Sequence, residues 1–330
     1  MARRPGVVHD EDGGVCVCYE SAVSDALTDR LKKSLASVIR GKPRAIELVV
    51  IGALTEGHLL IEDVPGVGKT TLAKAFARSL ELSFSRVQFT PDLLPTDIVG
   101  AQTLGPDGRL VFQKGPIFTQ VLLADEINRA SPRTQSALLE AMSERQVTVD
   151  GTTYSFPGPF IVLATQNPVD FQGTFPLPEA QLDRFTIRLS MGYPDEADEL
   201  EMLTQEATGS GLAPIQPIGT EAEFAEVRAR VRQVHMEKRV LVYLRRLVHE
   251  TRQSEHVALG VSPRGGITLY RTAQARAFVH GRDYVTPDDI QDLAKPVLAH
   301  RMVLTERARY GGMGVDTVIA GLLDEVPVPR

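Results

Sequence analysis

One stretch organises this 330-residue sequence: Ile61–Thr71, which reads IEDVPGVGKTT. The apolar run His58–Glu62 has the length of a buried strand, and helical periodicity begins at Thr70. A strand, a glycine-rich loop and Gly-Lys-Thr at a helix start point backbone N–H groups at a phosphate chain. Asp63 stands where the general pattern of such loops has its first glycine, so the neighbouring sequence has to support the assignment.

Two later apolar runs end in polar residues suited to the same chemistry. Val121–Ala124 leads into Asp125 and Glu126, and Phe160–Ala164 leads into a segment that contains Asn167. Uninterrupted apolar runs of this length are typical of strands covered on both faces of a parallel sheet. At the ends of such strands, Asp125 would hold Mg²⁺ through its water shell, Glu126 would polarise an attacking water, and Asn167 would orient that water.

Helical periodicity fills the intervals between these strands. Residues 23–50 predict two helices separated by a turn at Gly41-Lys42-Pro43, and Ser131-Pro132 opens a helix between the second and third strands. Alternating strands and helices predict an α/β fold with a parallel sheet between helices. Two hairpins interrupt it, at residues 102–112 and 146–156, because an Asp-Gly turn separates two alternating runs in each.

The strand patterns stop near Pro194, and helical stripes follow to the end of the chain. Thr286 and Asp289 mark one helix start there, as the cap and the reciprocal capping residue. We therefore predict a flexible leader over residues 1–22, an α/β nucleotide-binding domain over residues 23–194, and an all-helical domain over residues 195–330.

Composition and charge limit the classes of partner and site that the chain can have. With 36 Lys and Arg residues against 42 Asp and Glu residues, the net charge is −6, which disfavours nucleic acid as the main partner. No stretch approaches the roughly 18 uninterrupted apolar residues of a membrane span. Cys16 and Cys18 have no second pair to complete a zinc site, and we expect them to be inert thiols of a cytoplasmic protein.

The ordered set of motifs resembles the MoxR family of AAA+ ATPases over about residues 25–325. Besides the stretch around Lys69, the set comprises DEINRA at residues 125–130, ATQNP at residues 164–168, PEAQLDRF at residues 178–185 and Ser262-Pro263-Arg264. The Asp63 departure is also of a kind seen in this family. The resemblance implies a P-loop AAA+ core followed by an all-α lid domain, ATP and Mg²⁺ as ligands, and hydrolysis of ATP to ADP and phosphate.

The resemblance also assigns roles that spacing alone does not. It implies that Arg184 reaches the γ-phosphate of a neighbouring subunit and that Arg264 is the second-sensor arginine of a lid helix. Arg129 is expected near the subunit boundary. The residues expected to act in catalysis are Glu126, Asn167, Arg184 and Arg264. The residues expected to bind the nucleotide are Val38, Ile39, Gly41, Pro65, Gly66, Val67, Gly68, Lys69, Thr70, Thr71 and Asp125, of which Thr70 and Asp125 hold Mg²⁺. Residues 38–42 resemble the segment that packs around the adenine in this family.

Simpler interpretations stay open for several of these residues. Arg184 could instead pair with a nearby acid such as Asp183 or Glu179. The inserted hairpins of the family tend to face a central pore or a partner, so Tyr154 and Phe156 are candidates for such contact. Strand packing is the better interpretation for Phe156.

The resemblance implies a homo-oligomeric ring, expected to be a hexamer, that acts as a chaperone-like remodelling or maturation factor for a protein client. The client class that it suggests carries a von Willebrand factor A domain. Two other functions remain as alternatives. One is a nucleic-acid motor or loader, which the acidic charge disfavours; the other is a nucleotide-gated scaffold with little turnover.

Overall fold

A computed structural model describes residues 8–9, 15–16, 26–104, 106, 108–156, 158–167, 173–207 and 215–329. The strands β1 (Val8–His9) and β2 (Val15–Cys16) pair with each other. The rest of the leader predicted over residues 1–22, Cys18 included, lies outside the described residues. Asp107 of the first hairpin turn and Pro168 of the ATQNP motif lie outside them as well.

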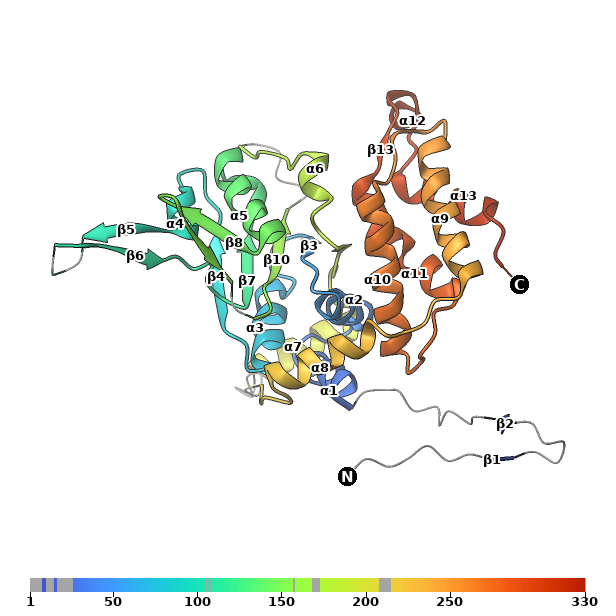
Figure 1. The fold of residues 1–330 in the computed structure, drawn as a ribbon, viewed down its shortest axis with the longest axis horizontal. Helices are drawn as coiled ribbons and strands as arrows, with labels where there is room; N and C mark the ends of the chain where they lie inside the picture. Colours follow the sequence, from blue (N-terminus) through green and yellow to red (C-terminus); the bar gives the residue numbers. More distant parts are fainter. Residues whose placement is uncertain are drawn as a thin grey trace.

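A parallel five-stranded sheet forms the centre of the chain, with the strand order β11-β3-β10-β7-β4 (Figure 1). Three of these strands, β3, β7 and β10, confirm the apolar runs of the sequence. The other two, β4 and β11, form the edges of the sheet and are not evident from the sequence pattern. The bounds are Leu59–Glu62 for β3, Phe84–Gln88 for β4, Val121–Asp125 for β7, Ile161–Gln166 for β10 and Ile187–Leu189 for β11.

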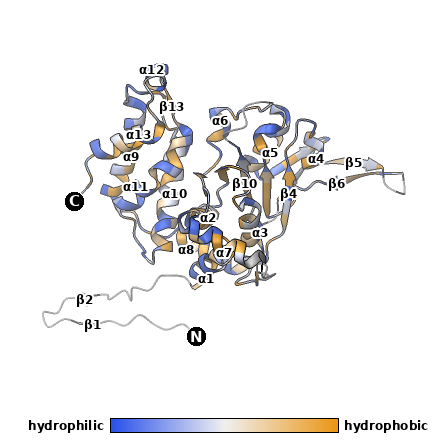
Figure 2. Ribbon diagram, turned by 180° about the vertical axis from the view of Figure 1, so that it is seen from behind, coloured by the Kyte–Doolittle hydropathy of each residue, from blue (hydrophilic) through white to orange (hydrophobic). Residues whose placement is uncertain are grey.

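Helices cover both faces of the sheet, and its residues alternate between two hydrophobic clusters. Leu59 and Ile61 of β3 belong to one cluster, whereas Leu60 belongs to the other. Because both faces are buried, the strand is apolar at every position before its last residue, Glu62. Figure 2 shows β10 as mostly hydrophobic, with hydrophilic residues on the outer helices. The first cluster includes α1 (Ala26–Ala36), α2 (Pro43–Leu54) and α3 (Lys69–Ser79), and the second includes α4 (Pro95–Val99) and α5 (Pro132–Glu144).

Both predicted hairpins are present, and the first projects from the body of the molecule (Figure 1). Tyr154 of the second hairpin stacks on Phe112 of the first, with ring centroids 4.2 Å apart. Phe156 is buried and stacks on Phe160, so it packs within the protein and does not face a partner. The hairpin strands are β5 (Gly100–Leu104), β6 (Leu110–Lys114), β8 (Gln146–Val149) and β9 (Thr152–Ser155).

Helices dominate the chain after Pro194. The helix α8 packs against α1 and α2 of the α/β core, while α9, α10, α11 and α13 pack together as a lid. The lid also contains the antiparallel pair β12–β13, which the prediction of an all-helical domain omitted. The bounds are α6 (Glu179–Leu182), α7 (Glu196–Ala207), α8 (Glu221–Val231), α9 (Lys238–Gln253), β12 (Val257–Leu259), α10 (Pro263–Val279), α11 (Pro287–Leu298), β13 (Val303–Leu304), α12 (Glu306–Tyr310) and α13 (Val315–Glu325). Within the described ranges, no helix is long and apolar enough to cross a membrane.

The predicted helix start at Thr286 is held by a buried charge cluster. Asp289 is fully buried, accepts the backbone N–H of Thr286 at 2.8 Å, and pairs with Arg276 and with Arg282. Burial raises the pKa of Asp289, but hydrogen bonds from Arg282, Thr286 and Arg276 outweigh burial and lower the pKa below its ordinary value. The carboxylate therefore stabilises the lid above the ordinary carboxyl pKa, and this contribution is lost as the pH falls through the depressed value.

We expect Asp289→Asn to lower the free energy of unfolding by about 3 kcal/mol at pH 7, because it leaves two arginines beside a neutral buried group. In urea denaturation the difference from the parent protein should shrink below about pH 4. Asp292→Asn is the control, since Asp292 also pairs with Arg276 but its side chain is 39% exposed. We expect that change to cost about 1 kcal/mol or less. A pH-independent loss for Asp289→Asn would contradict this account.

Candidate nucleotide-binding site

A cavity of about 280 Å³ lies at the carboxyl ends of β3, β7 and β10. Three strands and the start of α3 thus bring together residues that are about 100 positions apart in the sequence. Arg86 and Gln88 of β4 line the cavity although the sequence analysis did not identify them. The predicted residues that line it are Pro65, Gly66, Gly68, Lys69, Thr70, Thr71, Asp125, Glu126 and Asn167.

The loop before α3 needs two glycines for its shape. Gly66 and Gly68 have φ values of +86° and +92°, a region that residues with a side chain rarely adopt. A Cβ atom on Gly68 would also approach Ile39 Cδ1 to 3.4 Å. Because α3 begins at Lys69, the N–H groups of its first turn have no partner within the helix and are available to an anion.

The carboxylate of Asp63 explains why this loop lacks the first glycine of the general pattern. Asp63 is only 5% exposed, and its Oδ2 accepts the backbone N–H of Met191, that of Gly192 at 2.8 Å and the Ser190 hydroxyl at 3.2 Å. Its Oδ1 accepts the N–H of Val64 at 3.1 Å. The aspartate therefore ties the start of the phosphate loop to the segment that follows β11.

The ammonium of Lys69 lies against the same loop. Its Nζ donates to the carbonyl oxygens of Asp63 at 2.8 Å and of Val64 at 3.2 Å. Burial lowers the pKa of Lys69, and the nearby carboxylates of Asp63, Asp125 and Glu126 oppose this shift. A half-buried ammonium at a helix start, beside donor N–H groups, is suited to the terminal phosphates of a nucleotide.

Asp125 and Glu126, which follow one another at the end of β7, have separate sets of partners. Asp125 is 9% exposed and accepts from Thr165 Oγ1 at 2.6 Å and from Arg86 Nη2 at 2.6 Å. Glu126 Oε2 accepts from Gln88 Nε2 at 2.8 Å and from Arg129 Nη1 at 3.0 Å. The two acids therefore point to different partners although they are adjacent in the chain.

The backbone explains this divergence. Glu126 has a φ of +57°, which turns the chain sharply after β7. Its N–H donates to Thr165 Oγ1 at 2.9 Å, and the same hydroxyl donates to Asp125. Thr165 of β10 thus holds both acids, a role that no feature of the sequence revealed because threonine is common in strands.

The two arginines that the sequence analysis assigns to catalysis lie away from the cavity of their own chain. Arg184 follows α6 and donates through Nη1 to the carbonyl of Leu139 at 2.7 Å and to the Ser143 hydroxyl, both on α5. Arg264 is exposed on the first turn of α10. Among the residues that the structure describes, neither arginine lines the cavity, and the ion pair considered for Arg184 is replaced by contacts to α5.

Four predicted nucleotide-binding residues, three near the loop and one within it, do not line the cavity. Ile39 is buried beside Gly68, and Val38 and Val67 are partly buried against the first cluster. Gly41 has a φ of +65° and lies against Asp198 of α7. These residues support the loop from the side on which the sequence analysis expects the adenine.

Asp183 connects the lid to the segment that carries Arg184. Its carboxylate accepts from Ser262 Oγ at 2.9 Å, just before α10, and from Arg301 Nε at 2.8 Å. Arg301 is 4% exposed and also donates to the carbonyl of Phe185. Burial lowers the pKa of Arg301 to about 10, and the charge of Asp183 opposes this shift. The lid and the Arg184 segment are therefore joined through one buried ion pair.

Known proteins share this fold, motif order and domain arrangement. Residues 58–187 match the model of the ATPase family associated with various cellular activities (AAA), and residues 249–318 match the AAA lid domain. YeaC of Bacillus subtilis is 46% identical over 293 residues, which cover 88% of this chain and 92% of YeaC. Chaperone MoxR1 of Mycobacterium tuberculosis is 40% identical, over 89% of this chain and 80% of MoxR1.

The chain belongs to the MoxR family of AAA+ ATPases. The resemblance noted from the sequence is thereby confirmed, as is the AAA+ core with a helical lid. A crystal structure of a protein proposed to be an ATPase, from Cytophaga hutchinsonii, superimposes on this MoxR-family chain with a TM-score of 0.86. The two are 37% identical, over 92% of this chain and 95% of that chain. Members of the family bind nucleotide, usually with Mg²⁺, and generally form oligomers.

We expect Asp63→Gly to weaken nucleotide binding at least tenfold, although it restores the general phosphate-loop pattern. The change removes a buried acceptor and leaves the N–H groups of Met191 and Gly192 without it, at a cost of about 2 kcal/mol. Titration with a fluorescent ADP analogue measures the effect.

Glu62→Gln is the matched control, because the neighbouring Glu62 carboxylate pairs with Arg188 outside the loop. We expect its affinity for ADP to stay within about twofold of the parent. Unchanged ADP binding in Asp63→Gly would show that the anchor does not shape the loop.

Proposed function

We propose that this protein is a Mg-ATP-hydrolysing remodelling or maturation factor that works as a ring of identical subunits. The observation that carries the proposal is that a phosphate loop with Lys69, two acids at the end of β7 and Asn167 just after β10 line one cavity. The site combines hydrogen-bond donors for an anion, an acid that can bind a metal and a second acid that can activate water. This combination matches ATP hydrolysis better than nucleotide binding alone.

The residues present fit Mg-ATP. The loop from Pro65 to Thr71 supplies donor groups for the phosphates, and Thr70 and Asp125 supply the oxygen ligands that Mg²⁺ prefers. When bound, Mg²⁺ neutralises negative charge on the phosphate oxygens. Arg86, which pairs with Asp125, has a side chain that is 47% exposed and can turn toward solvent when the carboxylate takes another partner.

Glu126 is the proposed general base. It would accept a proton from the water that attacks the γ-phosphorus, while the bond between the β-γ bridging oxygen and that phosphorus breaks and releases ADP. Gln88 and Arg129 hold the Glu126 carboxylate at the cavity. Asn167, at the end of β10, would orient the water.

Arg184 is proposed to complete the cavity of a neighbouring subunit. Its guanidinium donates through Nη1 to Leu139 and Ser143 of α5, and Arg184 does not line the cavity of its own chain. A contact with a γ-phosphate would therefore be made in another subunit, as a finger acting in trans requires. We propose the same ring interface as the place where Arg264 acts, in its own subunit or the next. A hexamer is the ring size that we propose.

The proposed client is a protein. MoxR1 of Mycobacterium tuberculosis carries the name chaperone, which supports a chaperone-like role here. We propose a client with a von Willebrand factor A domain and action in the cytoplasm, where ATP is supplied. The projecting first hairpin, with Leu104 73% exposed and Leu110 68% exposed, supports contact with such a client.

We expect the rate of ATP hydrolysis per subunit to rise with protein concentration, because each cavity needs Arg184 of another copy. Glu126→Gln should lower that rate at least a hundredfold and leave nucleotide binding intact. Phosphate release over a range of protein concentrations, together with nucleotide titration, measures both.

Glu140→Gln, at an exposed acid of α5, is the matched control and should keep the parent rate. If the parent and Glu126→Gln hydrolyse ATP equally slowly at every concentration, the catalytic assignment is wrong and a nucleotide-gated scaffold becomes the better account.

A further inference from the structure

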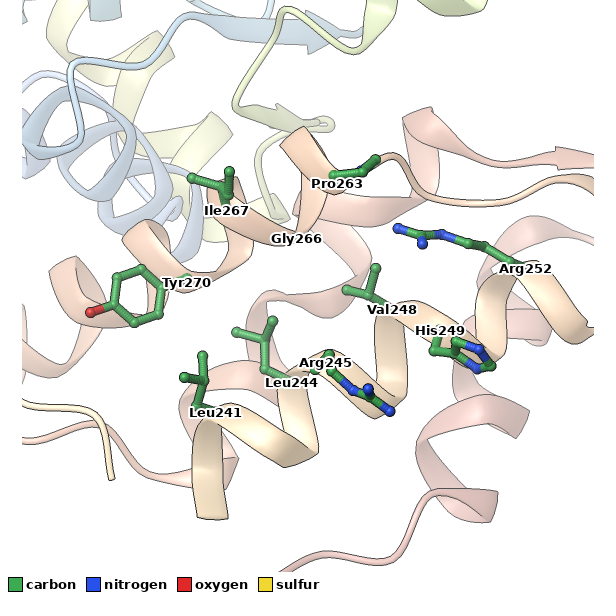
Figure 3. A pocket seen from close by; sticks show the side chains of 10 residues that line it. All are labelled: Leu241, Leu244, Arg245, Val248, His249, Arg252, Pro263, Gly266, Ile267 and Tyr270. Atoms are coloured by element: carbon green, nitrogen blue, oxygen red, sulfur yellow. The ribbon is translucent and has the colours of Figure 1, made fainter. Parts of the chain in front are cut away.

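The lid carries an apolar groove that the nucleotide site does not use. The groove lies between α9 and α10 and has a volume of about 600 Å³. Figure 3 shows Leu244 and Val248 of α9 pointing toward α10. Ile267 is 63% exposed and Leu241 is 44% exposed, so the groove opens to solvent. An exposed apolar surface of this kind on a soluble protein commonly marks an interaction site.

Two helix faces build the groove. On α9 the lining residues from Leu241 to Arg252 recur at spacings of three and four, which places them on one face. On α10 they include Gly266 and Ile267. A Cβ atom on Gly266 would meet only Val248, at 3.7 Å, so this glycine leaves space at the base of the groove. The groove therefore fits the side chains of another helix.

The charge of α9 limits which helix fits. The sequence of α9, KRVLVYLRRLVHETRQ, contains five Lys and Arg residues and a single acid, Glu250. Arg245 and Arg252 are among the residues that line the groove. An occupant with apolar residues flanked by carboxylates would match both the surface and its charge.

The same chain contains such a helix. The sequence of α7, EADELEMLTQEA, contains five acids and no Lys or Arg. Leu200 is 65% exposed and Leu203 is 64% exposed. Their spacing of three residues puts them on one face, with Glu199 beside them. Asp198 faces Gly41 of the core, so the leucines lie on the outer side of the helix.

We propose that α7 of one copy docks its Leu200–Leu203 face into the α9–α10 groove of a neighbouring copy. Figures 1 and 2 both show α7 apart from α9 and α10, so a chain presents a different surface to each neighbour. Repeated contact between two different surfaces generates a ring when the rotation closes. The inference rests on the proposed ring and names the surfaces that form it.

The contact also links the ring to the nucleotide site. Asp198 of α7 lies against Gly41, in the segment that the sequence analysis places around the adenine. The lid of one subunit would therefore contact α7 of the next subunit, and α7 borders the nucleotide site of that subunit.

Cross-linking between two differently labelled copies tests the docking directly. Both carry Cys16→Ser and Cys18→Ser; one then carries Leu203→Cys and the other Ile267→Cys. A short bis-maleimide should give a covalent dimer in the mixture and at most a trace with either variant alone. A mixture that gives no more dimer than the single variants, at a concentration where sedimentation shows oligomers, overturns the proposal.

The variant Leu203→Glu provides a second measurement, because it places a charge in the proposed apolar contact. Leu203 is exposed in the single chain, so the change should not disturb folding. We expect it to weaken self-association about tenfold or more in sedimentation velocity. Tyr310→Glu is the control, at a side chain that is 89% exposed outside the groove, and should assemble like the parent. Unchanged assembly of Leu203→Glu, with loss of binding to a foreign protein instead, would assign the Leu200–Leu203 face to that protein and overturn the proposal.

The cross-linking result and the result for ATP hydrolysis can be told apart. Hydrolysis that rises with protein concentration, without the cross-link, would leave the ring mechanism in place and exclude this interface. A cross-link in a protein that does not hydrolyse ATP would support the interface and exclude the enzyme.

Discussion

A loop that presents backbone N–H groups to a phosphate chain needs an external anchor, and here the buried Asp63 carboxylate provides it. By accepting hydrogen bonds from residues 190–192, it fastens the loop to the segment after β11, at the edge of the sheet. Lys69 and the start of α3 take their positions from that loop. The hydrogen bonds from backbone donors offset the cost of burying the carboxylate, whereas a glycine at this position would leave those donors unpaired.

A second aspartate joins the lid to the core. Asp183 pairs with Arg301 of the lid and with Ser262, two residues before Arg264, and it directly precedes Arg184. A displacement of the lid would therefore act on the segment that carries Arg184. Together the two aspartates connect the phosphate loop, β11 and the lid. In a ring, this arrangement would pass a change at one nucleotide site to the next subunit.

The sequence predicted the parts of the fold whose patterns are local. β3, β7 and β10 are apolar up to their last one or two residues because helices cover both of their faces, and Ser131 and Thr286 mark helix starts. β4 and β11 escaped notice because β4 buries little of its FSRVQ sequence and β11 has three residues. Arg86, one of the two partners of Asp125, was missed for the same reason, because it lies on β4. The anchoring of Asp63 and Asp183 depends on residues more than 75 positions away, which no local pattern encodes.

The central claim is that each active site contains Glu126 of one copy and Arg184 of another. Mixing Glu126→Gln protein with Arg184→Ala protein tests it most directly, because each variant alone lacks one half of every site. Hybrid rings would contain sites with an intact Glu126 from one variant and an intact Arg184 from the other. The account predicts that the inactive proteins recover roughly a quarter of the parent ATP turnover when mixed in equal amounts. A mixture that co-assembles and remains as inactive as its components would contradict a site shared between copies.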